Sequence, residues 1–258
     1  MRNIAAICQK ELKQMFSGAL AYVILAGFLM LTGFFFYDLF SRYTEILGYP
    51  DIYQQPGMMD QINVNALILT PLFQNMCIVL LMLIPLIAMQ LYAKEKNAGT
   101  DQLLLTSPVS VSEIVTGKFL AGAAFYTLAL ALTLLFPAIV AKYASPDMGK
   151  IAAGYLGLYF VGLAFLAVGL FISTLTSSQA VAAVATNWAL LVIYVILGWI
   201  AERLPGLTAT VVRYLGMGDH FERFGEGLFD ISDLVYFLGF IAFFWFLTTR
   251  SVESTRWR

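Results

Sequence analysis

Six long apolar stretches run almost end to end along this chain of 258 residues, and they constrain its fold more than any other feature. A helix needs roughly 20 apolar residues to cross a bilayer. The stretches approach or exceed that length at residues 18–37, 66–92, 119–141, 151–174, 180–201 and 234–249. Only 12% of the residues are charged, against about 25% in soluble domains. The sequence therefore predicts an all-α integral membrane protein with six transmembrane helices in a single domain.

Two details of these stretches refine the prediction. The second stretch contains Pro71 and Pro85, and a proline inside a helix removes a backbone hydrogen bond, so we expect this span to be kinked or tilted. Only residues 175–179 separate the fourth stretch from the fifth. A connection this short is typical of two antiparallel neighbouring helices, and we expect a tight helical hairpin there.

The lysines and arginines are distributed unevenly between the segments that connect the spans. If the N-terminus lies in the cytoplasm, nine of the 15 fall in the inner segments and six in the outer ones. The positive-inside rule then places both termini in the cytoplasm. Residues 93–118 become an inner loop and residues 250–258 a cytoplasmic tail, whereas residues 38–65 and 202–233 form long outer segments.

Two segments outside the spans have an amphipathic pattern. In residues 1–17, charged residues such as Glu11 fall on other sides of a helix whose apolar positions are Ile4, Cys8, Leu12 and Met15. This pattern predicts a helix that lies on the inner membrane surface, although a simple polar leader to the first span is the alternative. In residues 202–233, apolar residues at a broken helical spacing are interrupted by glycines. We expect short amphipathic or re-entrant helices at the outer interface, before the sixth span.

The interiors of the six stretches contain no charged residue and no histidine. Charged side chains within a membrane usually mark proton relays or ion paths, so the sequence argues against a proton-coupled pump or an ion-coupled carrier. The polar side chains that remain include the amides Gln74, Asn75 and Asn187. These amides can form hydrogen bonds between helices, or they can line the pathway of a substrate, and the sequence leaves both interpretations open.

The residue patterns of enzymes are absent as well. The pair Gly117-Lys118 lacks the glycine-rich lead of a P-loop, so the chain is not expected to hydrolyse ATP. The one histidine, His220, lies near Asp219 and Glu222 in an outer segment, without the partners that a catalytic site needs. We expect it to be a surface residue of an acidic loop. The chain is therefore expected to be neither an enzyme nor a metal or cofactor protein.

The inner loop combines charges, a helix break and a leucine cluster. Gly99 interrupts the helix after the second span, Asp101 begins a short helix, and Pro108 ends it. Ser110 or Ser112 can then start the next helix, and Glu113 stands three residues after Ser110, the spacing of a capping box. The short helix carries three consecutive leucines beside charges. Such a cluster needs an apolar partner, either lipid or a groove on another protein, and the residues alone favour neither.

This loop resembles the inner loop of the permeases of type-2 ABC exporters. In that family a glutamate and a basic residue follow the second span. A Gly-Thr, a leucine-rich segment, a Ser/Thr-Pro and a helix ending in Gly-Lys come next. The matching residues here are Glu95, Lys96, Gly99, Thr100, Leu103, Leu104, Ser107, Pro108, Gly117 and Lys118. The start, with Lys10-Glu11-Leu12, is similar too. In detail the chain looks closest to gliding-motility-associated and nitrous-oxide-reductase-maturation permeases.

The resemblance implies the permease subunit of an ABC transporter, driven by a separate cytoplasmic ATPase that binds ATP and Mg. The coupling segment would comprise Glu95, Lys96, Gly99, Thr100, Asp101, Leu103, Leu104, Ser107 and Pro108. The second and fifth spans would line the central path, on which Gln74, Asn75 and Asn187 would then lie. The expected partners are the ATPase, a second permease protomer, an extracytoplasmic accessory protein and membrane lipid, without nucleic acid. The expected location is a bacterial inner membrane.

Two other functions remain open on the sequence alone. The chain could be a membrane anchor or assembly factor that recruits partners without moving a substrate. It could also be a small carrier that works without ATP. The leucine-rich loop favours the ABC transporter, because neither alternative requires such a loop. The substrate, the direction of transport and the symmetry of the dimer are not determined by the sequence.

Overall fold

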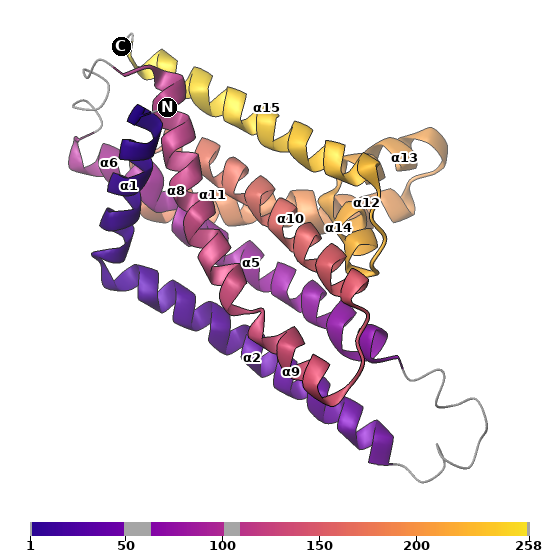
Figure 1. Cartoon of the computed structure of the whole chain (residues 1–258). Helices are drawn as coiled ribbons and strands as arrows, with labels where there is room; N and C mark the ends of the chain where they lie inside the picture. Colours follow the sequence, from indigo (N-terminus) through magenta and orange to yellow (C-terminus); the bar gives the residue numbers. More distant parts are fainter. Residues whose placement is uncertain (1, 49–62, 101–108, 257–258) are drawn as a thin grey trace.

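The computed structural model describes residues 2–48, 63–100 and 109–256, and every regular element in this part of the chain is a helix (Figure 1). Six helical segments are long and apolar enough to cross a membrane. They are Ala19–Gly48, Asn65–Ala98, Val111–Tyr143, Met148–Leu175, Gln179–Arg203 and Ile231–Ser254. The predicted all-α architecture with six spans is confirmed. Both termini lie at the same end of the bundle, which we call the N-terminal end.

Several spans are built from more than one helical piece. In chain order the helices are α1 (Arg2–Phe16), α2 (Ala19–Gly48), η1 (Asn65–Leu69), α5 (Thr70–Leu91), α6 (Ala93–Ala98), α8 (Val111–Leu132), α9 (Leu135–Tyr143), α10 (Met148–Leu175), α11 (Gln179–Leu191), η2 (Val192–Ile196), α12 (Leu197–Arg203), α13 (Gly206–Leu215), α14 (Met217–Gly225) and α15 (Ile231–Arg256). The second span thus joins η1, α5 and α6, and the third joins α8 and α9. The fifth joins α11, the π-helical turn η2 and α12.

The fourth span, α10, forms the centre of the bundle and packs against α5, α8, α11, α14 and α15. Small residues on α10 allow this close packing. A Cβ atom at Gly162 would lie 2.3 Å from the ring of Tyr126, and one at Gly157 would lie 2.4 Å from the Cβ atom of Phe224. The small residues that the sequence places in this span therefore serve contacts within the chain.

Prolines free two backbone carbonyls inside the spans, and another helix supplies a donor to each. Pro85 has no N–H to give to the carbonyl of Leu81 one turn earlier. The side-chain amide of Asn187 donates to that oxygen at 3.3 Å. In the same way Pro137 cannot donate to Thr133, whose carbonyl accepts the Tyr155 hydroxyl at 2.9 Å. These bonds satisfy polar groups that would be costly in lipid.

The first helix of the spans, α2, continues from Tyr37 to Gly48, beyond the apolar stretch of residues 18–37. A charged pair makes this extension possible, because Arg42 Nε lies 3.0 Å from Asp38 Oδ2 one helical turn away. The extension also packs against α9, where the rings of Phe40 and Tyr143 lie 6.2 Å apart. The outer segment that is predicted to begin at residue 38 is thus helical through Gly48.

Three local predictions are confirmed. Ser110 caps α8, and its side chain and that of Glu113 form the reciprocal hydrogen bonds of a capping box. The fourth and fifth spans form a hairpin in which Ser178 caps α11. In the segment before the sixth span, α13 and α14 are short helices on either side of Gly216. These helices lie at the end of the bundle opposite the termini (Figure 1).

The N-terminal helix α1 forms as predicted, but its buried face is rotated from the apolar positions that the sequence suggests. The buried residues are Ile7, Glu11 and Met15, and α1 packs against α8. The helices approach closely because a Cβ atom at Gly117 would lie 2.8 Å from the Cβ atom of Ile7. The expectation that Glu11 belongs to the polar face was wrong, because a buried lysine of α8 neutralises it.

Candidate functional site

The segment that leads into the predicted coupling residues is α6, at the N-terminal end of the bundle. Gly99 ends α6 with φ 66°, a left-handed conformation that glycine adopts without strain. The backbone N–H of Thr100 then donates to the carbonyl of Glu95 at 3.1 Å. The other predicted coupling residues, Asp101, Leu103, Leu104, Ser107 and Pro108, lie outside the described residues. Of the coupling segment, the structure therefore describes Glu95, Lys96, Gly99 and Thr100.

A fully buried lysine joins α6 to two other helices. Lys118 lies on α8, where its Nζ atom is 2.9 Å from Glu11 Oε1 on α1 and 2.8 Å from Glu95 Oε2 on α6. The same atom donates to the carbonyl of Leu91 at 2.6 Å. An ammonium group has three hydrogens to donate. All three donors of Lys118 thus have an acceptor within reach, which is what a buried cation requires.

A second lysine completes this arrangement, which we call the Lys118 cluster (Lys10, Glu11, Glu95 and Lys118). Lys10 Nζ lies 2.7 Å from Glu95 Oε1 and 3.2 Å from Glu11 Oε1. Burial acts to lower the pKa of Lys10, but the hydrogen bond to Glu95 and the two nearby carboxylates outweigh it. The pKa of Lys10 therefore lies above its ordinary value. Two positive and two negative groups balance, so α1, α6 and α8 meet at a neutral buried network.

The same end of α6 is also bound to α10. Lys96 Nζ donates to the carbonyl of Thr174 near the end of α10. The hydroxyl of Ser173 accepts the backbone N–H groups of Tyr92 and Ala93 at the junction of α5 and α6. Thr174 in turn hydrogen-bonds Ser251 of α15 at 2.8 Å. The short helix before the loop is therefore connected, directly or through one neighbour, to four other helices.

The opposite end of the bundle has its own buried polar group, which we call the His220 cluster (His220, Arg223 and Asp233). Asp233 Oδ1, at the start of α15, lies 2.5 Å from His220 Nδ1 and also pairs with Arg223, both on α14. His220 Nε2 lies 3.1 Å from the carbonyl of Tyr214. The cluster fastens α14 to α15.

The expectation that His220 is a surface residue was therefore wrong. The side chain is buried, and the ring of Tyr236 stacks on it with the centroids 3.9 Å apart. The adjacent Asp219 and Glu222 suggested an exposed acidic loop. Helical geometry instead puts His220 and Arg223 on the same face of α14, three residues apart, where both reach Asp233. This partner is distant in the sequence, so local context pointed the wrong way.

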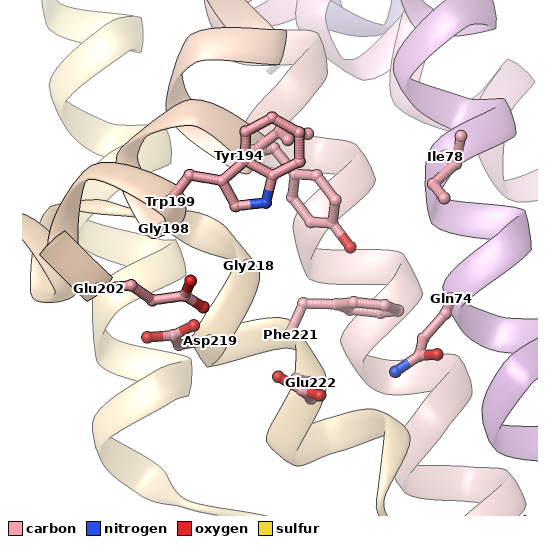
Figure 2. Close-up of a pocket in the computed structure, with 11 residues that line it drawn as sticks. Gln74, Ile78, Tyr194, Gly198, Trp199, Glu202, Gly218, Asp219, Phe221 and Glu222 are labelled. Atoms are coloured by element: carbon pink, nitrogen blue, oxygen red, sulfur yellow. The ribbon is translucent and has the colours of Figure 1, made fainter.

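A pocket opens between the second and fifth spans, next to α14 and away from the termini (Figure 2). Its volume is about 330 Å³. Gln74 and Ile78 line it from α5, whereas the other walls come from η2, α12 and α14. The lining residues are Gln74, Ile78, Tyr194, Val195, Gly198, Trp199, Glu202, Gly218, Asp219, Phe221 and Glu222. Of the amides Gln74, Asn75 and Asn187, Gln74 is the one at this pocket.

The comparison with protein families agrees with this architecture. The model that describes the ABC-2 family transporter proteins matches residues 5–250, which is nearly the whole chain. The chain belongs to the ABC-2 transporter family. It is therefore a multi-pass membrane subunit of the ABC transporter permease class, whose members generally dimerise and work with an ATPase. No curated protein matches the sequence.

Within this ABC-2 permease, the other two amides occupy different surroundings. Asn187 donates to the carbonyl freed by Pro85, and it also lines a second, smaller pocket with Met82 and Trp188. Asn75 is half-buried on α5. A role of Asn75 and Asn187 along a substrate pathway stays a prediction. For Asn187 the structure adds a definite structural task, which is to complete the hydrogen bonding of a helix that contains a proline.

Sequence reasoning missed the two buried clusters. The Lys118 cluster draws its members from segments far apart in the chain, and the His220 cluster joins two consecutive helices. Lys118 was placed in the loop although it is part of α8. One signal was present in the sequence. Lys10 and Glu11 belong to the motif by which the start of the chain resembles this family. Two adjacent side chains of opposite charge can each form an ion pair with a different residue. Nothing local indicated that these partners would be Glu95 and Lys118.

Proposed function

We propose that this ABC-2 permease is driven by a separate cytoplasmic ABC ATPase that docks on residues 93–118. ATP hydrolysis in that partner would be coupled to export or to mechanical work across the membrane. The Lys118 cluster is the observation that supports this proposal most. It fastens α6, which contains the predicted coupling residues Glu95 and Lys96 and leads into the others, to α1 and α8. A helix held in this way passes a displacement on to several spans instead of absorbing it.

The proposed cycle needs no catalytic group in this chain. ATP and Mg are bound by the partner ATPase, which contacts Asp101, Leu103, Leu104, Ser107 and Pro108. Movement of that segment displaces α6, then α8 through Glu95 and Lys118, and α10 through Lys96. Nucleotide in the partner thereby shifts the population of the spans between inward-facing and outward-facing states.

The proposal also includes a second permease protomer, identical or different. The most apolar windows of α15 and of the fifth span are each only 17% buried within the chain. Faces this exposed need lipid or another protomer as cover. The N-terminal end would be cytoplasmic and the membrane a bacterial inner membrane. An extracytoplasmic accessory protein, and a relation to gliding-motility-associated or nitrous-oxide-reductase-maturation permeases, belong to the same proposal.

Crosslinking in native membranes tests the ATPase partner. Lys94 is the residue to follow, because Lys118 is fully buried and Lys96 is engaged with Thr174. We expect an amine-reactive reagent to join Lys94 to a protein that contains a P-loop, as identified by mass spectrometry. Lys142, on α9, lies toward the other end of the third span and serves as the control that should not form this crosslink.

Substitution of the leucines decides whether the contact is specific. Leu103→Asp combined with Leu104→Asp should abolish the crosslink at Lys94. The same change at two exposed leucines of α13, Leu207 and Leu215, should leave it intact. If no ATPase is recovered at Lys94, the coupling proposal fails. A passive anchor or an ATP-independent carrier would then describe the chain better.

A further inference from the structure

The pocket beside Gln74 carries more negative charge than the part of the chain around it neutralises. Glu202, Asp219 and Glu222 line it together. Asp219 has a partner in Arg213, whose Nε atom lies 3.5 Å from its carboxylate. In the described part of the chain, no ion pair is found for Glu202 or Glu222. A ligand that enters this pocket therefore meets an excess of negative charge.

Apart from the amide of Gln74, the remaining side chains of the lining are aromatic or apolar. Trp199 and Ile78 are both exposed, and Tyr194 and Phe221 add two further rings (Figure 2). The faces of aromatic rings attract organic cations, with tryptophan the strongest of them. A hydrated metal ion would interact with the carboxylates but would not contact the faces of the aromatic rings. An apolar body that carries a positive charge would use both.

The pocket is also held in shape before any ligand arrives. The ring of Phe221 is buried, and the ring of Tyr194 packs edge-on against Phe165 of α10 with the centroids 5.7 Å apart. A Cβ atom at Gly218 would lie 2.9 Å from the carbonyl of Tyr194, so α14 and η2 are in close contact. The His220 cluster then fastens α14 to α15. Preformed walls reduce the cost of ordering the site on binding.

We propose that this pocket binds organic cations that have an apolar body, such as quaternary ammonium or phosphonium compounds. Their source is either a soluble compound on the outer side or the ammonium headgroup of an outer-leaflet lipid. The assignment to the outer side rests on the orientation in the proposed function. Binding itself does not, because the pocket lies within one chain and involves none of the predicted ATPase-coupling residues.

The test uses two probes of similar size and shape but opposite charge, tetraphenylphosphonium and tetraphenylborate. Their affinities would be measured by equilibrium binding to the full chain in nanodiscs of phosphatidylglycerol, whose headgroup carries no ammonium group. Glu202→Gln combined with Glu222→Gln should weaken the binding of tetraphenylphosphonium roughly tenfold, since each exposed carboxylate contributes modestly. Trp199→Leu should weaken it about threefold. Tetraphenylborate should bind the charge variant at least as well as the original chain.

Glu226→Gln is the matched control, because Glu226 follows directly on α14 without lining the pocket. It should leave both affinities unchanged. The proposal is overturned if the double variant binds tetraphenylphosphonium as tightly as the original chain does. It is equally overturned if both probes lose affinity together, since that result would describe an apolar pocket without charge selectivity.

A third arm separates the two sources of the cation. Phosphatidylethanolamine added to the nanodiscs should compete with tetraphenylphosphonium if the site accepts a lipid headgroup. An absence of competition would assign the site to soluble cations, and either result supports the shared chemistry. Because no ATPase is present, charge-selective binding would stand even if the Lys94 crosslink failed. A confirmed crosslink without charge-selective binding would refute the pocket assignment alone.

Discussion

The Lys118 cluster and the His220 cluster lie toward opposite ends of the bundle, and both bury charge, but they differ in how completely the charges are satisfied. Lys118 is fully buried, and each of its three donors has an acceptor. Asp233 is just as buried, yet its Oδ2 atom has no hydrogen-bond partner in the described part of the chain. In the Lys118 cluster every donor of the buried lysine has an acceptor, whereas the His220 cluster contains one carboxylate oxygen without a hydrogen-bond partner.

Each cluster has one buried and one half-exposed basic side chain, Lys118 with Lys10 in the first and His220 with Arg223 in the second. Arg223, which pairs with Asp233, keeps 42% of its side chain exposed, so water can replace part of this interaction. Lys118 is fully buried, so water cannot replace its hydrogen-bond partners. A buried charge without its partner is strongly destabilising, whereas a partly solvated pair contributes less. The comparison indicates a rigid connection beside the predicted coupling loop, and a weaker one holding α14 next to the pocket.

The largest effect is expected from Lys118→Met, which removes the charge and keeps the length of the side chain. Glu11 and Glu95 would then share only Lys10, which is half exposed. We expect a loss of about 3–5 kcal/mol in the free energy of unfolding, measured by denaturation in detergent. Lys142→Met, outside the cluster, is the control and should change little. A loss no larger than that of the control would contradict the rigid role of the Lys118 cluster.

Asp233→Asn tests the weaker cluster with a substitution of similar shape. The neutral amide loses the charged pairing with Arg223, but Arg223 can turn toward water. We expect a loss of about 2 kcal/mol, together with faster hydrogen exchange confined to α14 and the start of α15. If this variant loses as much stability as Lys118→Met, then the two clusters are equally rigid and the contrast between them is wrong.

A matched pair of glycine substitutions compares the two ends without changing any charge. Gly117→Ala would push α1 away from α8, because the new Cβ atom would meet the Cβ atom of Ile7. Gly157→Ala would push α14 away from α10 at Phe224. Each should cost about 1–3 kcal/mol, since overpacking forces the backbone to shift. Gly157→Ala should also alter the pocket and weaken tetraphenylphosphonium binding, whereas Gly117→Ala should leave binding unchanged.

The smallest effect is expected between the two clusters, at Asn187. Asn187→Leu would leave the carbonyl of Leu81 without the donor that replaces the missing N–H of Pro85. We expect a loss of about 1 kcal/mol, typical of one hydrogen bond between membrane helices. Adding Pro85→Ala restores a backbone donor, so the double variant should recover most of the loss. If the double variant does not recover stability, Asn187 has a role other than this hydrogen bond, such as one in the substrate pathway.

The sequence alone was sufficient for those features that depend on neighbouring residues. Six apolar stretches of the length of a bilayer predicted the six spans, because lipid accepts only helices whose backbone groups are satisfied internally. Ser110 and Glu113, three residues apart, predicted the capping box at the start of α8. The motif in the inner loop was enough to indicate a type-2 ABC permease. The interactions that form the spans and the capping box involve either residues a few positions apart or the membrane itself.

Only the tertiary structure decided where the buried charges meet and where the pocket lies. Lys118 resembled a loop residue, and His220 resembled a surface residue, until other helices brought them carboxylates. The pocket likewise combines Gln74 with Glu202 and Glu222, which are far apart in the sequence. The physical reason is that the pairing and burial of a charge depend on all the helices packed around it. The spacing of residues within a short segment does not show which helices these will be.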